Sequence, residues 1–463
     1  GEQVVVVVAA DEHDLVDDLP ELGEHRLGDL DHLVDRRLAQ LERVAEHYQP
    51  LDPVAQPRGE RRSQLRPPQQ VDLRQGAEVQ VGDDERGQGP GRLTSPAVLD
   101  GLLVADFSRV LAGPYATMLL GDLGADVVKV ERPGTGDDTR GWGPPWRGGD
   151  ATYYLGLNRN KRSVVLDLAD PEDRALARAL ALEADVLVES FRPGLMAGWG
   201  LDGDTLRAAG NAKLVSCSVT AFGSGPEGAT LPGYDFLAQA VGGVMHVTGQ
   251  EDGPPTKVGA AVVDLICGLL SAIGILAALR GGGGRHVETS LMDAALTALL
   301  NQGSAWVLGG TSPGRMGNRH PSIVPYETFA TADREIAIAV GNDRLFARLW
   351  EALDLEPDPR YATSAQRVEH RDELSARLAA TLRAEPAAHW LALLRERGVP
   401  AGPVNDVPEA WALAEALGLE PLQDGFPAPP LRVDGTRPAV RRLPPALDEH
   451  GDDVRAWLRS LAR

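Results

Sequence analysis

Short apolar runs alternate with amphipathic stretches from residue 99 onward, and this alternation is the strongest structural signal in the chain. Residues 114–123 and 171–184 have helical spacing, and Pro171 suits the first turn of a helix. Strands that alternate with helices of about 10–15 residues indicate βαβ units and a doubly wound parallel sheet. Five apolar runs are predicted as strands: 102–107, 126–130, 163–168, 185–189 and 213–219.

The pattern changes towards the C-terminus. Residues 262–279 predict a buried helix, and a strand at 286–289 and a helix at 291–300 follow. After residue 318 a strand at 336–340 is followed by three amphipathic helices and, after a Pro-rich run, a last helix at 452–461. The three helices are predicted at 345–353, 369–382 and 388–397. We therefore expect an α/β fold with a large domain at 98–310, a smaller α+β domain at 311–415 and a C-terminal segment, 416–463, that returns to the large domain.

Residues 1–97 have a different composition from the rest of the chain. They contain no Lys, Cys, Trp, Phe or Met, and Tyr48 is their one aromatic residue. Residues 11–47 have the pattern of an acidic helix, and the remainder has too little apolar mass to offset chain entropy. The first Met is Met118, and Val98 would serve as a non-ATG start. We expect residues 1–97 to be a disordered extension or mistranslated upstream sequence.

Composition excludes several classes of function. The net charge of −21 argues against a nucleic-acid partner, although a few local Arg residues suffice to bind a phosphorylated ligand. The two cysteines, Cys217 and Cys267, lie in apolar runs and predict buried thiols rather than a disulfide framework or a zinc site. The apolar run 265–279 is shorter than the ~20 residues of a membrane span, and residues 4–10 lack the basic flank of a signal peptide. We expect a cytoplasmic protein without a membrane or metal partner.

A candidate nucleophile follows the last of the five predicted strands. Gly233-Tyr234-Asp235 lies downstream of the strand and turn at 213–226, and a carboxylate at the mouth of a glycine-rich loop is able to attack a thioester carbonyl. The alternative is a solvated turn Asp. Residues 223–228 match G-x-G-x-x-G, but Gly228, Pro232 and Gly233 leave no helix of useful length for a dinucleotide pyrophosphate.

Several longer motifs occur in order around this Asp. Together they resemble the family III CoA-transferases, which include formyl-CoA transferase, carnitine CoA-transferase and the α-methylacyl-CoA racemases. The resemblance covers roughly residues 98 to 450 and implies a Rossmann-like large domain, a smaller domain and a homodimer of two interlocked rings. The motifs are LDGLLVADFSRVLAGPY (99–115), LGADVVKVERPG (123–134), NRNKRSVVLD (158–167), Val263-Asp264, GNRHPSIVPY (317–326) and GND (341–343).

The resemblance also implies a mechanism. Asp235 would attack the donor acyl-CoA to give a mixed anhydride, and the released CoA thiolate would convert it to an aspartyl-CoA thioester. A carboxylic acid acceptor would then attack, and the steps would reverse onto the new acyl group. The implied partners are an acyl-CoA and a carboxylic acid. CoA enters as a thioester substrate, and no permanently bound cofactor or metal is needed.

The family pattern places CoA contacts along the predicted strand ends. The implied contacts are Val110, Leu111, Arg132, Leu166, Ser190, Phe191 and Arg192, with Phe222 and Gly223 in a turn whose backbone N–H groups would face the thioester oxygen. Ala169 stands where formyl-CoA transferase has a Lys. Residues 317–322 replace that enzyme's mobile tetraglycine segment, which puts formate and oxalate in doubt as substrates.

Tyr234 separates the transferases from the racemases, which resemble this chain but have a His at this position. Tyr, with a reference pKa near ~10, is a poor base for removing an α-proton. Asp264 lies at the second acid/base position of the racemases, where transferases also have an Asp, so it does not discriminate. Arg319 and His320 are candidates to bind the distal carboxylate of a dicarboxylic acid such as succinate. The alternatives are an α-methylacyl-CoA racemase and a non-catalytic acyl-CoA-binding protein.

Overall fold

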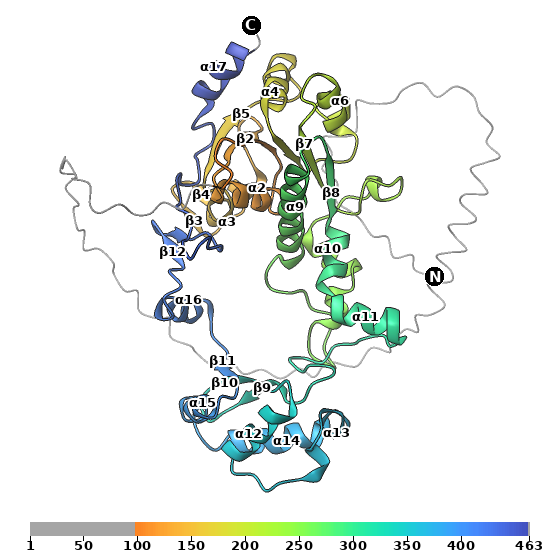
Figure 1. Cartoon of the computed structure of the whole chain (residues 1–463), viewed down its shortest axis with the longest axis vertical. Coiled ribbons are helices and arrows are strands. Elements are labelled where there is room, and N and C mark those ends of the chain that lie inside the picture. The colour runs from red at the N-terminus through yellow and green to blue at the C-terminus, as the bar shows by residue number, and fades with distance from the viewer. Residues whose placement is uncertain (1–97, 462–463) are drawn as a thin grey trace, which may run out of the picture. The chain divides into compact units, whose positions relative to one another are not determined.

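A six-stranded parallel sheet forms the centre of the computed structural model, which describes residues 98–461 (Figure 1). The predictions made for residues 1–97 lie outside the described residues. The sheet has the order β5-β2-β1-β6-β7-β8, and every neighbouring pair of strands is parallel. Its strands are β1 (Leu103–Phe107), β2 (Asp126–Glu131), β5 (Lys161–Val165), β6 (Val186–Glu189), β7 (Val215–Thr220) and β8 (His286–Ser290).

The strand order is that of a doubly wound nucleotide-binding sheet. Numbered within the sheet, the strands follow the order 3-2-1-4-5-6 of the Rossmann fold. The order reverses between β1 and β6, which pair directly from Val104↔Val186 to Phe107↔Glu189. Ligands of such sheets bind beyond the carboxyl ends of the strands at this reversal. The sequence prediction of a parallel α/β sheet is confirmed.

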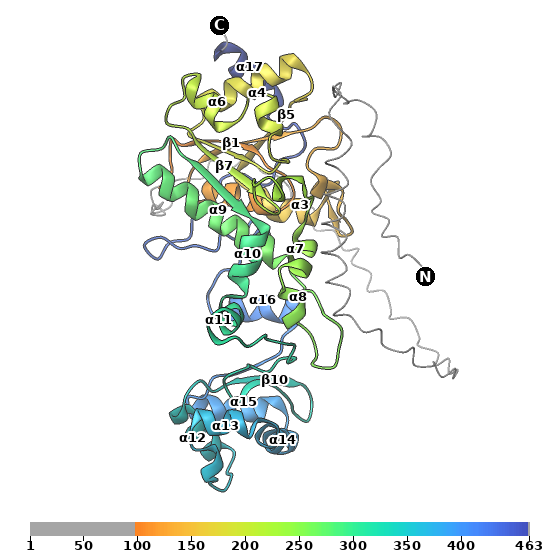
Figure 2. The ribbon, with the colours of Figure 1, turned by 90° about the vertical axis from the view of Figure 1, so that its right-hand side faces the viewer.

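Helices cover both faces of the sheet. Helices α2 (Ala112–Asp122) and α9 (Val262–Arg280) pack together on one face, where α9 also contacts β7 and β8. Helix α4 (Pro171–Glu183) packs on the other face, and the C-terminal helix α17 (Gly451–Leu461) lies against α4 and β5. Figure 2 shows α9 below the strands and α4 above them. Two apolar cores therefore lie on opposite sides of one sheet.

Helix α9 corrects the expectation about apolar length. It runs for 19 residues and is long and apolar enough to cross a membrane by length and composition alone. The helix predicted at 262–279 matches these bounds to within one residue, whereas the apolar run 265–279 omits its first turn. Val263, Cys267 and Ile275 are fully buried in the core between α9 and the sheet. The core helix of a soluble protein passes the same test of length and composition, so this helix is weak evidence for a membrane span.

A second, antiparallel sheet forms around residues 326–403. Its order is β11-β10-β9, with β9 at Tyr326–Ala330, β10 at Glu335–Ala339 and β11 at Ala401–Pro403. Helices α12 (Asp343–Ala352), α14 (Arg371–Leu382) and α15 (Ala387–Glu396) supply the apolar residues of its core. The three amphipathic helices predicted from the sequence thus appear within a few residues of their expected bounds. The domain boundaries at 310/311 and 415/416 stay predictions.

Several elements were not expected from the sequence. The most important is α7 (Asp235–Val241), a helix that begins at the candidate nucleophile. The others are β9, β11, α3 (Thr152–Leu157), α5 (Leu195–Gly198), α6 (Gly203–Ala208), α8 (Val244–Val247), α11 (Leu300–Gly309), α13 (Ser364–Glu369), α16 (Val407–Ala416), β3 (Trp146–Arg147), β4 (Asp150–Ala151), β12 (Leu422–Gln423), β13 (Phe426–Pro427) and the 3-10 turns at Asp138–Gly141, Gly228–Thr230 and Pro359–Tyr361. Helix α10 (Leu291–Ala298), by contrast, corresponds to the helix predicted at 291–300.

Candidate functional site

A pocket of about 140 Å³ lies where β1, β6 and β7 end, at the reversal of the strand order. Residues 109–113 follow β1, residues 190–193 follow β6, and residues 219–221 include the last two residues of β7; residues 231–234 close the pocket. Eight residues that the sequence analysis proposed line it: Val110, Leu111, Ser190, Phe191, Arg192, Gly223, Tyr234 and Asp264. The fold thus brings together residues that are more than 150 positions apart in the chain.

Asp235 lies directly behind this lining. It is the first residue of α7, its side chain is buried, and its neighbour Tyr234 lines the pocket. Its Oδ1 accepts the backbone N–H groups of Val263 (2.9 Å) and Asp264 (3.2 Å) at the start of α9. A helix N-terminus presents unpaired N–H groups and a partial positive charge, so it stabilises a carboxylate at this position. The alternative of a solvated turn Asp does not fit this burial.

A glutamine that the sequence analysis missed holds the other oxygen. Gln239 donates its Nε2 to Asp235 Oδ2 across 2.6 Å, and its own Oε1 accepts the Val258 N–H at 2.8 Å. The Gln239 side chain is fully buried, so its orientation is fixed by these two contacts. Its position four residues after Asp235 was the available signal, because residues i and i+4 share one face of a helix.

A glycine allows the nucleophile to approach the turn after β7. A Cβ atom on Gly233 would lie 2.7 Å from Ala221 Cβ and 3.0 Å from Phe222 Cε2. Any other residue would therefore push Tyr234 and Asp235 away from this turn. This contact also places Phe222, which does not line the pocket itself, against the segment that carries Asp235.

Asp264 is a second carboxyl group in the pocket wall. Burial, together with the nearby charge of Asp235, raises its pKa to about 7. Burial and the charges of Asp264 and Asp235 likewise raise the pKa of Tyr153 to about 12, which places the Tyr153 hydroxyl within electrostatic range of both carboxyls. Tyr153 was not among the predicted site residues. The site therefore holds one carboxyl group that titrates near neutral pH beside a candidate nucleophile.

The glycine-rich turn is engaged in contacts of its own. Gly223 donates its backbone N–H to Thr220 Oγ1 at 3.0 Å, and Ser224 donates its backbone N–H to Glu288 Oε1 at 2.7 Å. In this conformation neither N–H is available to an oxygen in the pocket. The two N–H groups that do meet an oxygen of the candidate nucleophile, Asp235 Oδ1, belong to Val263 and Asp264.

Two arginines line the pocket, and a third shares Asp138 as an ion-pair partner with one of them. Arg192 and Arg109 line it, and the Arg109 guanidinium lies 5.1 Å from the centre of the Phe191 ring. Arg132 forms an ion pair with Asp138, and its Nε donates to Thr135 Oγ1 at 2.7 Å. Guanidinium groups suit phosphate binding, so this rim has the chemistry to hold an anionic ligand in an acidic protein. Arg109 was quoted in a motif but not proposed as a site residue.

Besides Asp235, Arg132 and Phe222, three further proposed residues do not line the pocket. Leu166 is 1% exposed and packs in the apolar core below α4, so its side chain faces other core residues. Arg319 pairs with Glu251 and, at 2.9 Å, with Asp372. The His320 ring packs edge-on against Tyr326 at 5.3 Å. The ligand-binding roles of all three stay predictions.

Within the described residues, neither the two cysteines nor any cluster of metal-binding side chains adds a reactive group to the site. Burial raises the pKa of Cys217 to about 12 and that of Cys267 to about 11, so both are thiols at neutral pH. Residues 98–461 hold no group of three or more His, Cys, Asp or Glu side chains placed to bind a metal ion.

Comparisons with known proteins agree with this arrangement. Residues 99–451 match the sequence profile described as CoA-transferase family III. A succinate–glutarate CoA-transferase from Agrobacterium fabrum is 40% identical over 387 residues, which span 79% of this chain and 96% of that protein. An acetyl-CoA:oxalate CoA-transferase from Acetobacter aceti is also 40% identical, over 77% of this chain and 94% of that protein.

A solved structure shares the fold. The crystal structure of a CaiB/BaiF family protein from Brucella suis superposes with a TM-score of 0.70 at 40% sequence identity. The match covers 79% of this chain and all of the other.

Proposed function

The chain belongs to CoA-transferase family III, and we propose that its transfer of CoA runs through a thioester formed on Asp235. As a CoA-transferase it acts on acyl-CoA and carboxylate substrates. The observation that carries the proposal is the Asp235 carboxylate, buried behind the pocket wall and held by three hydrogen-bond donors. Such a carboxylate is positioned for attack and is shielded from competing water.

The steps balance without a proton, a metal or a redox partner. An Asp235 oxygen attacks the donor carbonyl carbon, the C–S bond breaks, and CoA thiolate leaves behind a mixed anhydride. The thiolate attacks the Asp235 Cγ, forms a C–S bond and releases the donor acid as its carboxylate. The acceptor carboxylate then attacks Cγ and expels CoA thiolate, which finally attacks the acceptor's carbonyl carbon. Acceptor acyl-CoA leaves, and the Asp235 carboxylate is regenerated.

The contacts of Asp235 support different roles for its two carboxylate oxygens. Each attack on Cγ places negative charge on the oxygen that stays bound to carbon. Oδ1, held by the Val263 and Asp264 N–H groups, is suited to receive that charge. Oδ2, held by Gln239 alone, is then the oxygen that bonds to the acyl group.

Dicarboxylic acids are the acceptor class that we propose. The relatives are named for succinate and glutarate, oxalate and mesaconate, all of which are dicarboxylates. The oxalate transferase and the succinate–glutarate transferase are equally identical to this chain. The doubt that the sequence raised about oxalate therefore does not exclude it as an acceptor. Arg109 and Arg192 are cations in the pocket lining; Arg192 would pair with a phosphate of the donor, and Arg109 would be available to a carboxylate of the acceptor.

Intact-protein mass spectrometry with succinyl-CoA tests the mechanism. A CoA-sized adduct on the wild-type chain, absent in Asp235→Asn and retained in Asp264→Asn, would support Asp235 as the carrier. Hydroxylamine should convert the adduct to a hydroxamate on Asp235. If no acyl-CoA gives an adduct and the α-proton of a 2-methylacyl-CoA exchanges with deuterium, the racemase alternative holds. Binding without either reaction would indicate an acyl-CoA-binding protein.

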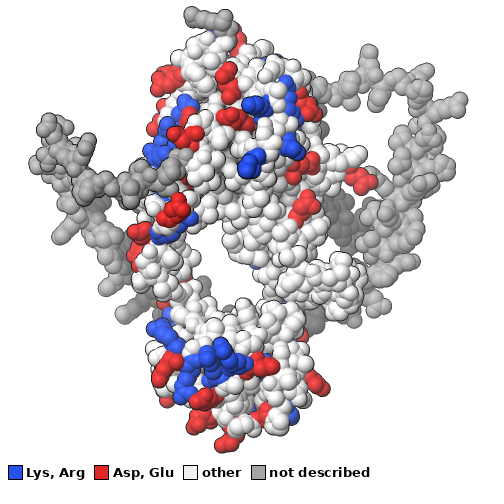
Figure 3. Space-filling view, in the orientation of Figure 1, with Lys and Arg blue, Asp and Glu red and all other residues white. Residues whose placement is uncertain are grey.

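We also propose a homodimer. The segment 294–314 carries no charged residue, and the surface over α11 appears without Lys, Arg, Asp or Glu in Figure 3. Its exposed apolar side chains include Leu300 (73%), Trp306 (60%) and Leu308 (85%). Exposed apolar patches of this kind mark interaction sites. Analytical ultracentrifugation should give twice the chain mass, and a monomer at micromolar concentration would contradict this proposal.

A further inference from the structure

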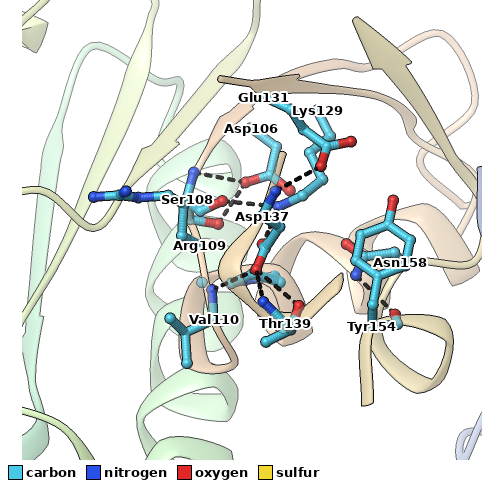
Figure 4. A network of polar contacts seen from close by, with 12 residues as sticks. Asp106, Ser108, Arg109, Val110, Lys129, Glu131, Asp137, Thr139, Tyr154 and Asn158 are labelled. Carbon is cyan, nitrogen blue, oxygen red and sulfur yellow. Dashed lines mark hydrogen bonds and ion pairs between the residues drawn. The ribbon is translucent and has the colours of Figure 1, made fainter. Parts of the chain in front are cut away.

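A cluster of buried charges lies behind the pocket wall, and the proposed mechanism uses none of it. Lys129 on β2 and Lys161 on β5 are fully buried, and so is Asp106 on β1. Asp137, in the segment after β2, is 1% exposed and forms an ion pair with Lys129 at 2.8 Å. Figure 4 shows Lys129, Asp106 and Asp137 gathered behind the turn that follows β1. Buried charges are costly, so a cluster of this size calls for a specific role.

The turn that these charges surround has a strained backbone. Val110 has φ = +70°, a left-handed conformation that is unfavourable for a β-branched residue. Val110 and the next residue, Leu111, both line the pocket. Strained residues persist only where their surroundings over-determine the conformation, and they cluster at ligand sites.

Three side chains hold two successive peptide groups of this turn. Lys129 Nζ donates to the Ser108 carbonyl oxygen at 2.9 Å. The Arg109 N–H donates to Ser190 Oγ at 3.0 Å, and the Val110 N–H donates to Asp137 Oδ1 at 3.3 Å. The dashed line from Val110 to Asp137 in Figure 4 marks the last of these contacts.

The segment after the turn is equally constrained. A Cβ atom on Gly113 would lie 2.3 Å from Ser108 Cβ, so the start of α2 packs directly against the beginning of the turn. The turn therefore has no room to relax towards α2. A change in its backbone would have to move Val110 and Leu111 relative to the pocket.

We propose that the buried Lys129–Asp137 ion pair is a positioning device that holds Val110 and Leu111 in the conformation that binds acyl-CoA. The two residues hold neighbouring peptide groups on either side of Arg109, Lys129 at the Ser108 carbonyl and Asp137 at the N–H of the strained Val110. Because Lys129 and Asp137 also form an ion pair with each other, a shift of either side chain would disturb both contacts to the turn. The inference rests on the proposed function, because it assigns this pocket to CoA.

Both partners keep their charges at neutral pH. Burial alone would lower the pKa of Lys129, but the carboxylates of Asp137, Asp106 and Glu131 raise it above its usual value. Burial alone would raise the pKa of Asp137, but Lys129 and the hydrogen bonds from Thr139 lower it below its usual value. A charged acceptor binds a backbone N–H more strongly than a neutral one.

The test compares two buried Asp residues in the same part of the fold. Asp137→Asn removes the charge from the positioning pair. Asp122→Asn is the matched control, because Asp122 is also buried, pairs with Arg159 at 2.6 Å and does not line the pocket. Both variants leave a buried cation without its partner, so both should lower the unfolding midpoint. Calorimetric titration with free CoA then separates a positioning role from a structural one.

We expect Asp137→Asn to weaken CoA binding about tenfold or more and to raise the KM for acyl-CoA, with a smaller change in kcat. Asp122→Asn should leave CoA affinity near the wild-type value. If both variants are destabilised alike and bind CoA equally well, the inference is wrong. A wild-type chain that does not bind CoA would overturn the proposed function and this inference with it.

A milder variant covers the case in which Asp137→Asn fails to fold. Thr139→Val retains both charges but removes the hydroxyl that donates to Asp137 Oδ1 at 2.7 Å. We expect a smaller loss of CoA affinity in this variant, in the same direction. The loss should shrink in a Val110→Gly background, because Gly adopts a positive φ without strain. Equal losses in both backgrounds would contradict the link to the turn.

Discussion

Gln239 and Asp235 form a hydrogen bond one helical turn apart on α7, with Gln239 Nε2 donating to Asp235 Oδ2 across 2.6 Å. The bond is buried and charge-assisted, so it fixes the carboxylate plane while Val263 and Asp264 hold the second oxygen. Oriented in this way, the carboxylate presents a defined face to the pocket. Gln239 is therefore a positioning residue for the proposed nucleophile.

Replacement of Gln239 by Leu should lower kcat more than it affects substrate binding. A hydrogen bond to a charged group contributes about 1.5–3 kcal/mol, which corresponds to a rate loss of roughly 10- to 100-fold. Steady-state kinetics with succinyl-CoA and a dicarboxylate acceptor would measure it. Gln366→Leu is a suitable control, because Gln366 caps α13 and lies outside the site. A Gln239→Leu variant with wild-type kcat would refute the positioning role.

Asp264 should make the stability of the chain depend on pH. Its pKa is about 7 in the folded state and about 4 in the unfolded state, so between these values only the folded chain retains the proton. Stability from this group is thus present at low pH and lost as the pH rises through 7. The total is at most roughly 4 kcal/mol.

Asp264→Asn should remove this dependence. The variant's advantage over the wild type in free energy of unfolding should grow from pH 4 to pH 7 and level off above it. Denaturant unfolding at several pH values would measure the difference, with Asp293→Asn as a control for loss of one acidic side chain. A difference that is constant across this range would contradict the raised pKa.

The parallel sheet and its pocket were predictable because their signals are local. Each strand is an apolar run of a few residues, and the polar residues after β1, β6 and β7 follow directly from the sequence. The reversal between β1 and β6 then brings Val110 and Ser190 to one place, which the family resemblance anticipated but spacing alone does not determine.

Long-range contacts explain what the sequence did not show. The N–H groups that bind Asp235 come from Val263 and Asp264, and no side-chain pattern marks a backbone donor. The Lys129–Asp137 pair was hidden for a related reason, since a Lys in an apolar strand usually indicates an exposed edge. Helix α7 was not predicted because Pro232 and Gly233, which are typical of loops, lie immediately before its N-terminus.

Protonation of Asp264 should also control acceptor binding. An ionised Asp264 beside Asp235 would repel an incoming carboxylate, whereas the neutral form would not. We expect the KM for the acceptor acid to rise as the pH increases through about 7 and the KM for acyl-CoA to change less. In Asp264→Asn the acceptor KM should be flat over this range. The same rise in both enzymes would exclude Asp264 as its cause.

Arg192 should contribute to the binding of the donor rather than of the acceptor. It lines the pocket in the segment after β6, where the phosphates of CoA are proposed to bind. Arg192→Ala should raise the KM for acyl-CoA about tenfold and should weaken its dependence on salt, because one phosphate contact is lost. Arg178→Ala serves as the control, since Arg178 bonds to the Gly200 carbonyl oxygen and does not line the pocket. Equal KM values in wild type and Arg192→Ala would remove Arg192 from the CoA site.

Arg319 offers the sharpest test of the acceptor's second carboxylate. The structure pairs its guanidinium with Glu251 and Asp372, so a dicarboxylate would have to compete with these two side chains for it. Both partners are largely exposed, and exposed ion pairs contribute little to stability, so such an exchange would cost little free energy. If Arg319 binds the distal carboxylate, Arg319→Ala should raise the KM for succinate far more than the KM for a monocarboxylate of similar length. Asp372→Asn, which releases one of its two partners, should leave the succinate KM unchanged or lower it. If Arg319→Ala changes the KM of both acids equally and lowers the unfolding midpoint, Arg319 has a structural role as the ion-pair partner of Glu251 and Asp372.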